Sequence, residues 1–350
     1  MRGLPRAVYR ILVASFFSGM GMSLAWLFLN FHLEGLGFDR RLIGYANAIP
    51  AVSMVTLGIP AGFLIPQLGY GRSLRLGVVL GAIALGVVAW ARAPLAVFAA
   101  LLVYGLSQAV VMGATAPLLS ALVDGPRRVS VLSWQAALST GAGFVGNLAG
   151  GFLALLVGGP GGMLALAAAV FILSWLPLLG LRAGGAETRT RFRMARPLMW
   201  LKLLLPALVI GLGAGLIMPF LNLYLETKFA LSFELLGSLF AFSSLATMGA
   251  MLIQPALVRR LGKVGAIVAV QAASLPFILI LAYVPLLPIV TVALFVRGAL
   301  MNAAGPVYTA LVMELLNEEE QSVFLLSEAA IWNIGWALGS SLSGRLQAGM

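Results

Sequence analysis

The 350-residue chain is 61% hydrophobic and 9% charged, whereas a soluble domain typically carries about 25% charged residues. Its net charge is +11, but no basic stripe with interleaved aromatic residues is present, so we expect no nucleic-acid partner. The chain has no cysteine and one histidine, and it lacks G-x-S-x-G, H-E-x-x-H and P-loop motifs. Composition therefore argues against an enzyme, a metal site or a cofactor, and indicates a protein that is solvated mainly by lipid.

In chain order, apolar runs of roughly 20 residues or more follow one another, each long enough to cross a hydrocarbon core of ~30 Å. The first run is too long for the apolar core of a signal peptide and lacks a cleavage site, so we expect a retained helix. The fold class predicted is an all-α polytopic membrane protein. Eleven membrane helices are expected, at 8–33, 42–66, 73–91, 94–122, 130–158, 161–181, 199–225, 232–258, 263–285, 286–314 and 321–347.

The chain contains a long internal repeat. Phe28–Glu34 (FLNFHLE) returns as Phe220–Glu226 (FLNLYLE) at an offset of 192 residues. Several glycines recur at an offset of 193 residues, among them Gly44 and Gly237, Gly69 and Gly262, and Gly151 and Gly344. A period this long indicates one bundle of spans that was duplicated and fused. We expect a six-helix bundle over 1–181, a basic linker over 182–198, and a related bundle with five spans over 199–350.

The distribution of Lys and Arg predicts the orientation. A cytoplasmic N-terminus places sixteen of these residues on the inner side and five on the outer side, as the positive-inside rule requires. We therefore expect a multi-pass protein of the plasma (inner) membrane with its linker in the cytoplasm. The linker arginines fit a solvated loop near anionic lipid headgroups.

The loop after the second span carries a partial family signature. Gly62–Arg72 resembles the G-x-x-x-D-R-x-G-R-[KR] loop of the major facilitator superfamily, with Pro66 and Gln67 in place of its Asp and Arg. Its counterpart in the second half, Pro255–Lys263, keeps the basic residues. Together with six spans, a basic linker and a related second set, the whole chain resembles this superfamily of secondary transporters.

The resemblance implies twelve spans that surround a central cavity, and it extends to the fifth span. There Gly146–Gly151 (GNLAGG) resembles the exporter-associated G-P-x-x-G-G element, with Asn147 in place of the proline. Because this chain ends after the eleventh predicted span, either the last helix is missing from it or the protein is a natural truncation. Eleven spans would place the C-terminus outside.

Polar residues at membrane depth are candidates for function because burying them in lipid is costly. The resemblance implies that the first span of each half lines the cavity, and Trp26 and Asn30 lie on one helical face. The repeat pairs Asn30 with Asn222; the alternative for these amides is hydrogen bonding between helices. The predicted substrate-binding residues are Trp26, Asn30, Tyr104, Gln108, Gln135, Asn222, Arg297, Asn302 and Trp332.

Two charges in consecutive spans form the predicted proton-coupling pair. The repeat places Arg297 and Glu328 where the first half has neutral Tyr104 and Gln135. We expect both charges at similar depth, so that they meet each other or a charged substrate; a purely structural ion pair is the alternative. Tryptophans follow Glu328 at successive turns, and such an aromatic rail suits an amphiphilic or ring-shaped ligand, although core packing explains it as well.

Charges at the inner ends of the spans form the predicted cytoplasmic gate. Asp124 and Glu314 end the fourth and tenth spans, near Arg72 and Arg259/Arg260. We expect one set of ion pairs in each half, which holds the cytoplasmic side shut when the outer side is open.

The function predicted is secondary active transport of small molecules by alternating access. We favour proton-coupled export of lipophilic or amphiphilic compounds, because the cavity candidates are mostly apolar, aromatic and amide. Uptake of a neutral solute such as a sugar is one alternative, and a non-transporting membrane sensor with a transporter fold is another. The expected partners are a small-molecule substrate, the lipid bilayer and protons, and we expect a monomer.

Overall fold

The computed structural model describes residues 4–123, 125–181, 197–316 and 318–349. Within these ranges the chain forms helices and no strand. The helices are α1 (Arg6–Gly35), α2 (Arg40–Thr56), α3 (Gly58–Leu68), α4 (Tyr70–Trp90), α5 (Pro94–Ala121), α6 (Gly125–Leu153), α7 (Gly159–Leu173), α8 (Trp175–Leu178), α9 (Pro197–Ile217), the 3-10 turn η1 (Met218–Phe220), α10 (Leu221–Phe229), α11 (Phe233–Tyr283), α12 (Leu287–Leu315) and α13 (Glu318–Ala348).

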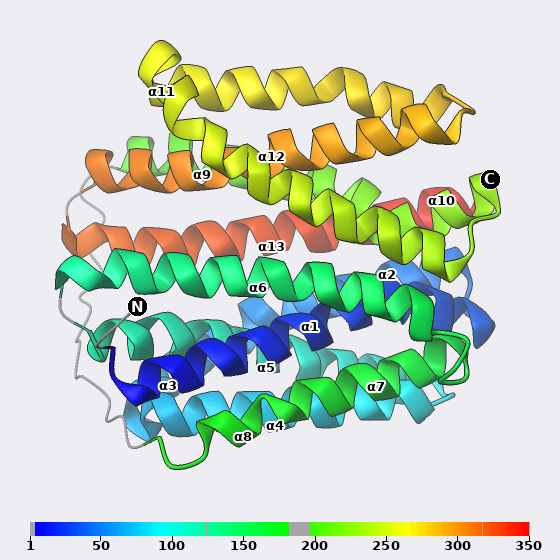
Figure 1. Ribbon diagram of the computed structural model, residues 1–350, viewed down its shortest axis with the longest axis horizontal. Coiled ribbons are helices and arrows are strands. Elements are labelled where there is room, and N and C mark those ends of the chain that lie inside the picture. Colours follow the sequence, from blue (N-terminus) through cyan, green and yellow to red (C-terminus); the bar gives the residue numbers. More distant parts are fainter. Residues whose placement is uncertain (1–3, 124, 182–196, 317, 350) are drawn as a thin grey trace.

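The long helices lie roughly parallel in one bundle, with the N-terminus at one end and the C-terminus at the other (Figure 1). We call the end of the bundle where α1 and α9 begin the linker end, and we call the opposite end the far end. Helices α1–α8 are referred to as the first half and α9–α13 as the second half.

The all-α membrane fold predicted from composition is confirmed. Among the described residues eight helical segments are long and apolar enough to cross a membrane, or nine when the bent pair α2 and α3 counts as one span. Helices α6 and α13, of 29 and 31 residues, lie in the bundle beside them. All these segments coincide in position with the apolar runs of the sequence.

The same glycine turn separates two spans in each half. Gly69, between α3 and α4, has φ 85°, and Gly262, inside α11, has φ 71°. Glycine adopts positive φ without a steric cost, which explains the residue type at both positions. Gly262 divides α11 into a first arm, 233–261, and a second arm, 263–283, so that one helical element supplies two spans.

The halves differ at their first spans. Helix α1 is continuous, whereas its counterpart is interrupted by η1 at Met218–Phe220 before α10 continues. Pro219 lies inside this break and has no N–H to donate, so the local ladder of hydrogen bonds is incomplete. Backbone groups freed inside a membrane need partners from neighbouring helices; the partner found here belongs to the other half.

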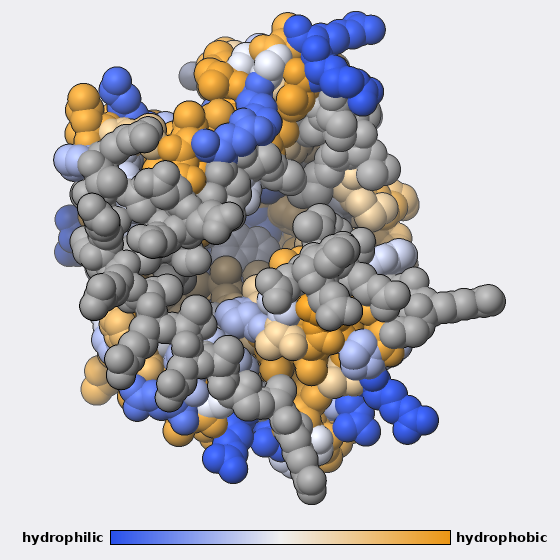
Figure 2. Space-filling view, turned by 90° about the vertical axis from the view of Figure 1, so that its left-hand side faces the viewer, coloured by the Kyte–Doolittle hydropathy of each residue, from blue (hydrophilic) through white to orange (hydrophobic). Residues whose placement is uncertain are grey.

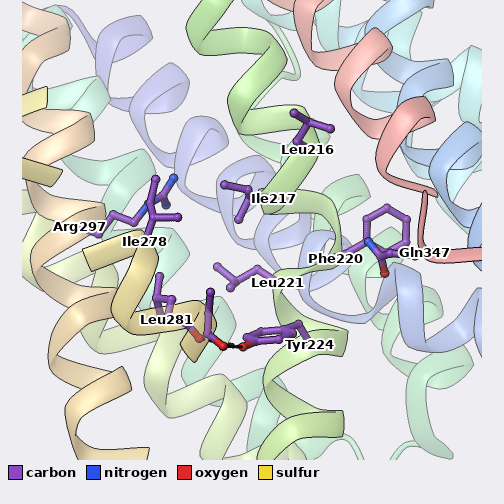
Figure 3. Close-up of a pocket in the computed structure, with 10 residues that line it drawn as sticks. Leu216, Ile217, Phe220, Leu221, Tyr224, Ile278, Leu281, Arg297 and Gln347 are labelled. Atoms are coloured by element: carbon purple, nitrogen blue, oxygen red, sulfur yellow. Dashed lines mark hydrogen bonds between the residues drawn. The ribbon is translucent and has the colours of Figure 1, made fainter. Parts of the chain in front are cut away.

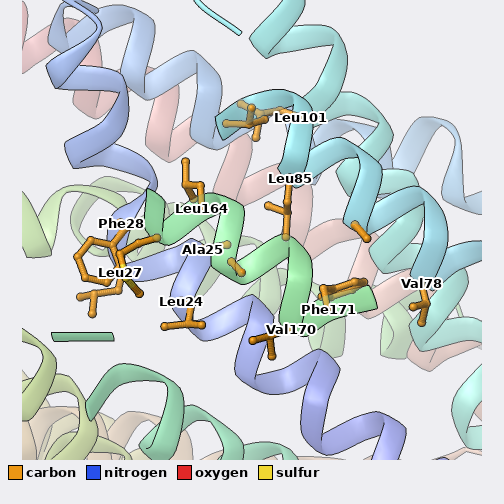
Figure 4. Packing of buried hydrophobic residues seen from close by; sticks show 14 of the residues in the cluster. Leu24, Ala25, Leu27, Phe28, Val78, Leu85, Leu101, Leu164, Val170 and Phe171 are labelled. Atoms are coloured by element: carbon orange, nitrogen blue, oxygen red, sulfur yellow. The ribbon is translucent and has the colours of Figure 1, made fainter. Parts of the chain in front are cut away.

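Apolar side chains of α1, α4, α5 and α7 build the core of the first half. Figure 4 shows Leu24 and Phe28 of α1 near Leu164 of α7, with Leu85 of α4 close by. Phe28 is fully buried, and its ring lies 5.5 Å from that of Phe233 at the start of α11. The same core therefore continues across the two halves at the far end.

The two halves touch through α2 against α13 and through α6 against α11. At the linker end, by contrast, the molecular surface is hollowed near its middle (Figure 2). The described contacts between the halves thus include a seal at the far end, and the surface of the linker end is hollowed.

Candidate functional site

Two buried asparagines join the halves in a reciprocal arrangement. Asn30 is 2% exposed and Asn222 is 5% exposed. Asn30 Nδ2 donates to the Pro219 carbonyl and, at 3.2 Å, to Asn222 Oδ1, while Asn222 Nδ2 donates to the Leu27 carbonyl at 2.8 Å. Leu27 and Pro219 are themselves 192 residues apart, so each amide binds the carbonyl three residues before its counterpart. Asn30 and Asn222 thus hydrogen-bond to each other between the halves, which is the alternative to substrate binding that the sequence left open for these amides.

A third amide, Asn47 of α2, completes this cluster and was not among the predicted residues. Its Nδ2 donates to Asn30 Oδ1 at 2.8 Å and to the Ile43 carbonyl at 2.9 Å. Phe240 occupies the corresponding position in the second half, so comparison of the two halves of the sequence did not single out Asn47. A lone amide within an apolar run was the only indication in the sequence.

Pairs of glycines bring helices of opposite halves into close contact around the amides. A Cβ on Gly44 of α2 would lie 2.9 Å from Gly344 Cα of α13, and one on Gly237 of α11 would lie 2.8 Å from Gly151 Cα of α6. The two pairs are related by the repeat offset of 193. Any larger side chain at these positions would force the helices apart, as in other small-residue contacts between membrane helices.

Polar side chains reinforce this far-end seal at its surface. Tyr45 of α2 accepts hydrogen bonds from Arg41 Nε at 3.1 Å and from Arg345 Nε of α13 at 2.9 Å. Arg345 also lies over the Tyr45 ring, 5.5 Å from its centroid. Tyr45 therefore ties the two halves together where the glycine pair Gly44 and Gly344 closes the gap.

Three tryptophans lie between the halves, on the linker side of the amides. The rings of Trp332 and Trp336 on α13 stack with centroids 5.2 Å apart, and Trp336 lies 5.4 Å from Trp26 on α1. Trp26 precedes Asn30 by four residues, or about 6 Å along the helix. The tryptophans thus form the first layer below the seal, toward the hollow.

Glu328 lies one helical turn beyond Trp332 on the same face of α13, toward the linker end. It is half-buried and within electrostatic range of Tyr308 on α12. Among the described residues no Lys or Arg forms an ion pair with it. A half-buried carboxylate and an aromatic stack therefore lie on one face of α13.

The predicted ion pair between Arg297 and Glu328 does not form. Helices α12 and α13 are antiparallel, and each residue lies ten positions after its own helix begins, so the two are about 15 Å from opposite ends of helices about 45 Å long. They are therefore at different depths. The two helices also have few contacts, because α13 packs on α9 and α2 while α12 packs on α11.

Three of the remaining predicted substrate-binding residues, Tyr104, Gln108 and Asn302, make their hydrogen bonds within their own half. Tyr104 accepts a hydrogen bond from Gln108 at 2.6 Å, and its ring packs on Phe171 within the first half. Asn302 is exposed and donates to the Gly298 carbonyl of its own helix at 2.8 Å. Gln135 lies half-buried on α6.

The predicted cytoplasmic gate is only partly described. Glu314 forms an ion pair with Lys263 and not with Arg259 or Arg260. The turn at Gly262 explains the difference, because Lys263 begins the second arm of α11, which packs beside α12, while both arginines end the first arm and are exposed. Arg72 is also exposed, and its predicted partner Asp124 lies outside the described residues.

Similar folds occur among solved transporters. A bacterial homologue of the human lysosomal transporter Spinster, in an inward-facing and occupied conformation, matches with a TM-score of 0.80 and 15% identity over 98% of this chain and 81% of that one. The nucleoside transporter NupG matches at 0.77 and 16% over 97% and 90%. A bacterial homologue of the iron transporter ferroportin, in an inward-facing state, matches at 0.73 and 15% over 100% and 93%. No curated protein sequence matches the chain.

The bundle of long apolar helices, sealed at one end and hollowed at the other, has the same fold as these solved transporters. The family model for the major facilitator superfamily matches residues 11–342, and the chain belongs to that superfamily.

Proposed function

We propose that this protein is a secondary active transporter in which the two halves, 1–181 and 199–350, move as two bodies about a central site. The linker end faces the cytoplasm of a plasma membrane, as the distribution of Lys and Arg predicts. In that orientation the conformation described above is open to the cytoplasm and closed to the outside. The chain functions as a monomer, because its substrate path runs between its own halves.

The observation that carries the proposal is the tryptophan layer beside Glu328. Trp26 and Trp336 touch across the halves, so this layer lies in the path of a solute that passes between them. Stacked rings bind flat apolar surfaces, and ring faces together with a carboxylate attract organic cations. The substrate class that fits is a lipophilic or amphiphilic compound with a planar or cationic group, which the protein exports.

Protons drive the transport through Glu328. While the hollow is open, the carboxylate meets water and is ionised. No Lys or Arg in the described part of the chain pairs with it, so once the halves close around it desolvation favours the protonated form. Rocking of the halves therefore loads and unloads a proton. Arg297 is not part of this step, because it lies at a different depth from Glu328.

The test is transport in proteoliposomes with ethidium, a planar lipophilic cation, as the probe. With an acidic interior the parent protein should accumulate ethidium, and Glu328→Gln should abolish that accumulation while exchange of labelled for unlabelled ethidium persists. Trp332→Ala should weaken both processes, whereas Asn302→Ala, which changes an exposed amide, should weaken neither. Gradient-driven accumulation that survives Glu328→Gln unchanged would remove Glu328 from the coupling step.

The same assay separates the alternatives. Uptake of a neutral solute would appear as accumulation of a sugar with an acidic exterior; it is disfavoured because Asn30, Asn47 and Asn222 satisfy one another and offer few free amide groups. A non-transporting sensor would move no probe under any gradient.

A further inference from the structure

A second cavity lies within the second half, apart from the tryptophan layer. It has a volume of about 300 Å³ and lies between α9–α10, the second arm of α11, and α12, close to η1 (Figure 3). Its walls are largely aliphatic and aromatic, and Arg297 is the one charged residue among the described residues that line it. No tryptophan lines it, so it is distinct from the proposed transport site.

Arg297 extends from α12 past Ile278 toward Ile217 (Figure 3). The residue is 6% exposed, and its Nε has no hydrogen-bond partner among the described residues. Nη1 reaches only the sulfur of Met218, at 4.0 Å. A buried guanidinium without an anion is strongly disfavoured, so this cavity contains an uncompensated positive charge in apolar surroundings.

The wall of the cavity at the far end is held in place by polar contacts. Tyr224 of α10 donates to the Leu281 carbonyl at 2.8 Å, which links α10 to the end of α11. Lys228 donates to Tyr224 Oη at 2.8 Å and to the Leu281 and Ala282 carbonyls at 3.1 and 3.0 Å. The cavity is thus preformed, and a second cation lies beside it.

We propose that this cavity is a binding site for a small lipophilic monoanion. The anionic group pairs with Arg297, and the apolar part packs against Ile217, Leu221 and Ile278. The volume is at the lower end of the range of about 300–1,000 Å³ for small-molecule sites, which fits a medium-chain or aromatic carboxylate. A free carboxylate and the headgroup of an anionic lipid share this chemistry, and either one supplies a negative charge that pairs with Arg297.

The test uses the full chain in phosphatidylcholine nanodiscs, with octanoate as the probe and octanamide as its neutral match. Calorimetric titration should show saturable binding of octanoate and none of octanamide. Arg297→Gln and Ile278→Trp, which keeps the charge but fills the space, should each weaken octanoate binding by about tenfold or more, equivalent to about 1.4 kcal/mol. Trp332→Ala, in the transport site, should leave it unchanged.

Two further readouts keep the proposal decisive. Because no anion pairs with Arg297 among the described residues, Arg297→Gln should raise the thermal midpoint of the ligand-free protein, whereas breaking a structural ion pair would lower it. If octanoate no longer binds when the nanodiscs contain phosphatidylglycerol, a lipid headgroup is the occupant of the cavity. If octanoate binding is unchanged in these nanodiscs, the occupant is a free solute. The proposal is overturned if octanoate does not bind the parent protein, binds Arg297→Gln equally well, or binds no better than octanamide. None of these results depends on transport of ethidium.

Discussion

At the scale of residues, hydrogen bonds made by side-chain amides of each half to the other half hold the halves together at the far end. Asn30 and Asn222 each donate to a carbonyl of the opposite first span. The break at Met218–Phe220 leaves the Pro219 carbonyl available, and Asn30 satisfies it. Buried amides that satisfy one another in this way specify one arrangement of the halves, since a slip of either helix would leave several polar groups unpaired.

Replacing one of these amides should destabilise the far-end seal. Asn222→Leu removes the acceptor of the Leu223 N–H and of one Asn30 hydrogen bond, together with a donor to the Leu27 carbonyl. Each buried group left unsatisfied costs about 1–3 kcal/mol. We expect a lower thermal midpoint of the purified protein, with Asn302→Leu, an exposed amide bonded to its own helix, within about 0.5 kcal/mol of the parent. A coupling energy of zero between Asn30→Leu and Asn222→Leu in a double-mutant cycle would contradict the reciprocal pairing.

Sequence reasoning succeeded at the duplicated stretch that carries Asn30 and Asn222, and it failed where a contact depends on how neighbouring helices pack. The repeat found Asn30 and Asn222 because their surroundings are duplicated. It missed Asn47, whose counterpart Phe240 is apolar. The repeat also did not predict the ion pair between Glu314 and Lys263, because the turn at Gly262 decides which basic residue faces α12. Such contacts depend on backbone direction, which composition does not encode.

At the scale of elements, apolar runs located the helices, but chain order did not predict which helices touch. Arg297 and Glu328 were expected to meet because their helices are consecutive; in the bundle, α13 lies against α9 and α2 instead. Helix length mattered too. Since α12 is 29 residues long, ten residues from its start is about a third of its length and not its middle.

The glycine pairs should control how closely the halves approach. In Gly44→Ala the new Cβ would lie 2.6 Å from the Ser340 carbonyl oxygen, so α2 and α13 must separate. We expect greater labelling of Ala48→Cys, which is buried beside Trp336, by an impermeant maleimide applied to intact cells. Gly86→Ala, where a Cβ meets nothing within 4 Å, is the matched control. Equal labelling in both variants would show that the glycine contact does not set the seal.

At the scale of the whole molecule, the contacts between the halves are related by the repeat. The pair Gly44 and Gly344 corresponds to Gly237 and Gly151, and the pair Asn30 and Asn222 corresponds to itself. A seal of matched contacts at one end and a hollow at the other describes one of two states of a rocking bundle. A ligand or proton shifts such an equilibrium only by its difference in affinity between the states.

The central claim, that the two ends open alternately, is tested by distances between spin labels. The chain has no cysteine, so introduced cysteines are unique. Leu68 and Leu261, 49% and 50% exposed, are repeat counterparts at the linker end; Ala93 and Leu286 are exposed counterparts at the far end. When the pH is changed from 8 to 5, and when ethidium is added, double electron–electron resonance in nanodiscs should show one distance lengthening as the other shortens. Gly44→Ala should favour the state with the longer 93–286 distance. Two distances that stay fixed under every condition, or that lengthen together, would contradict alternating access.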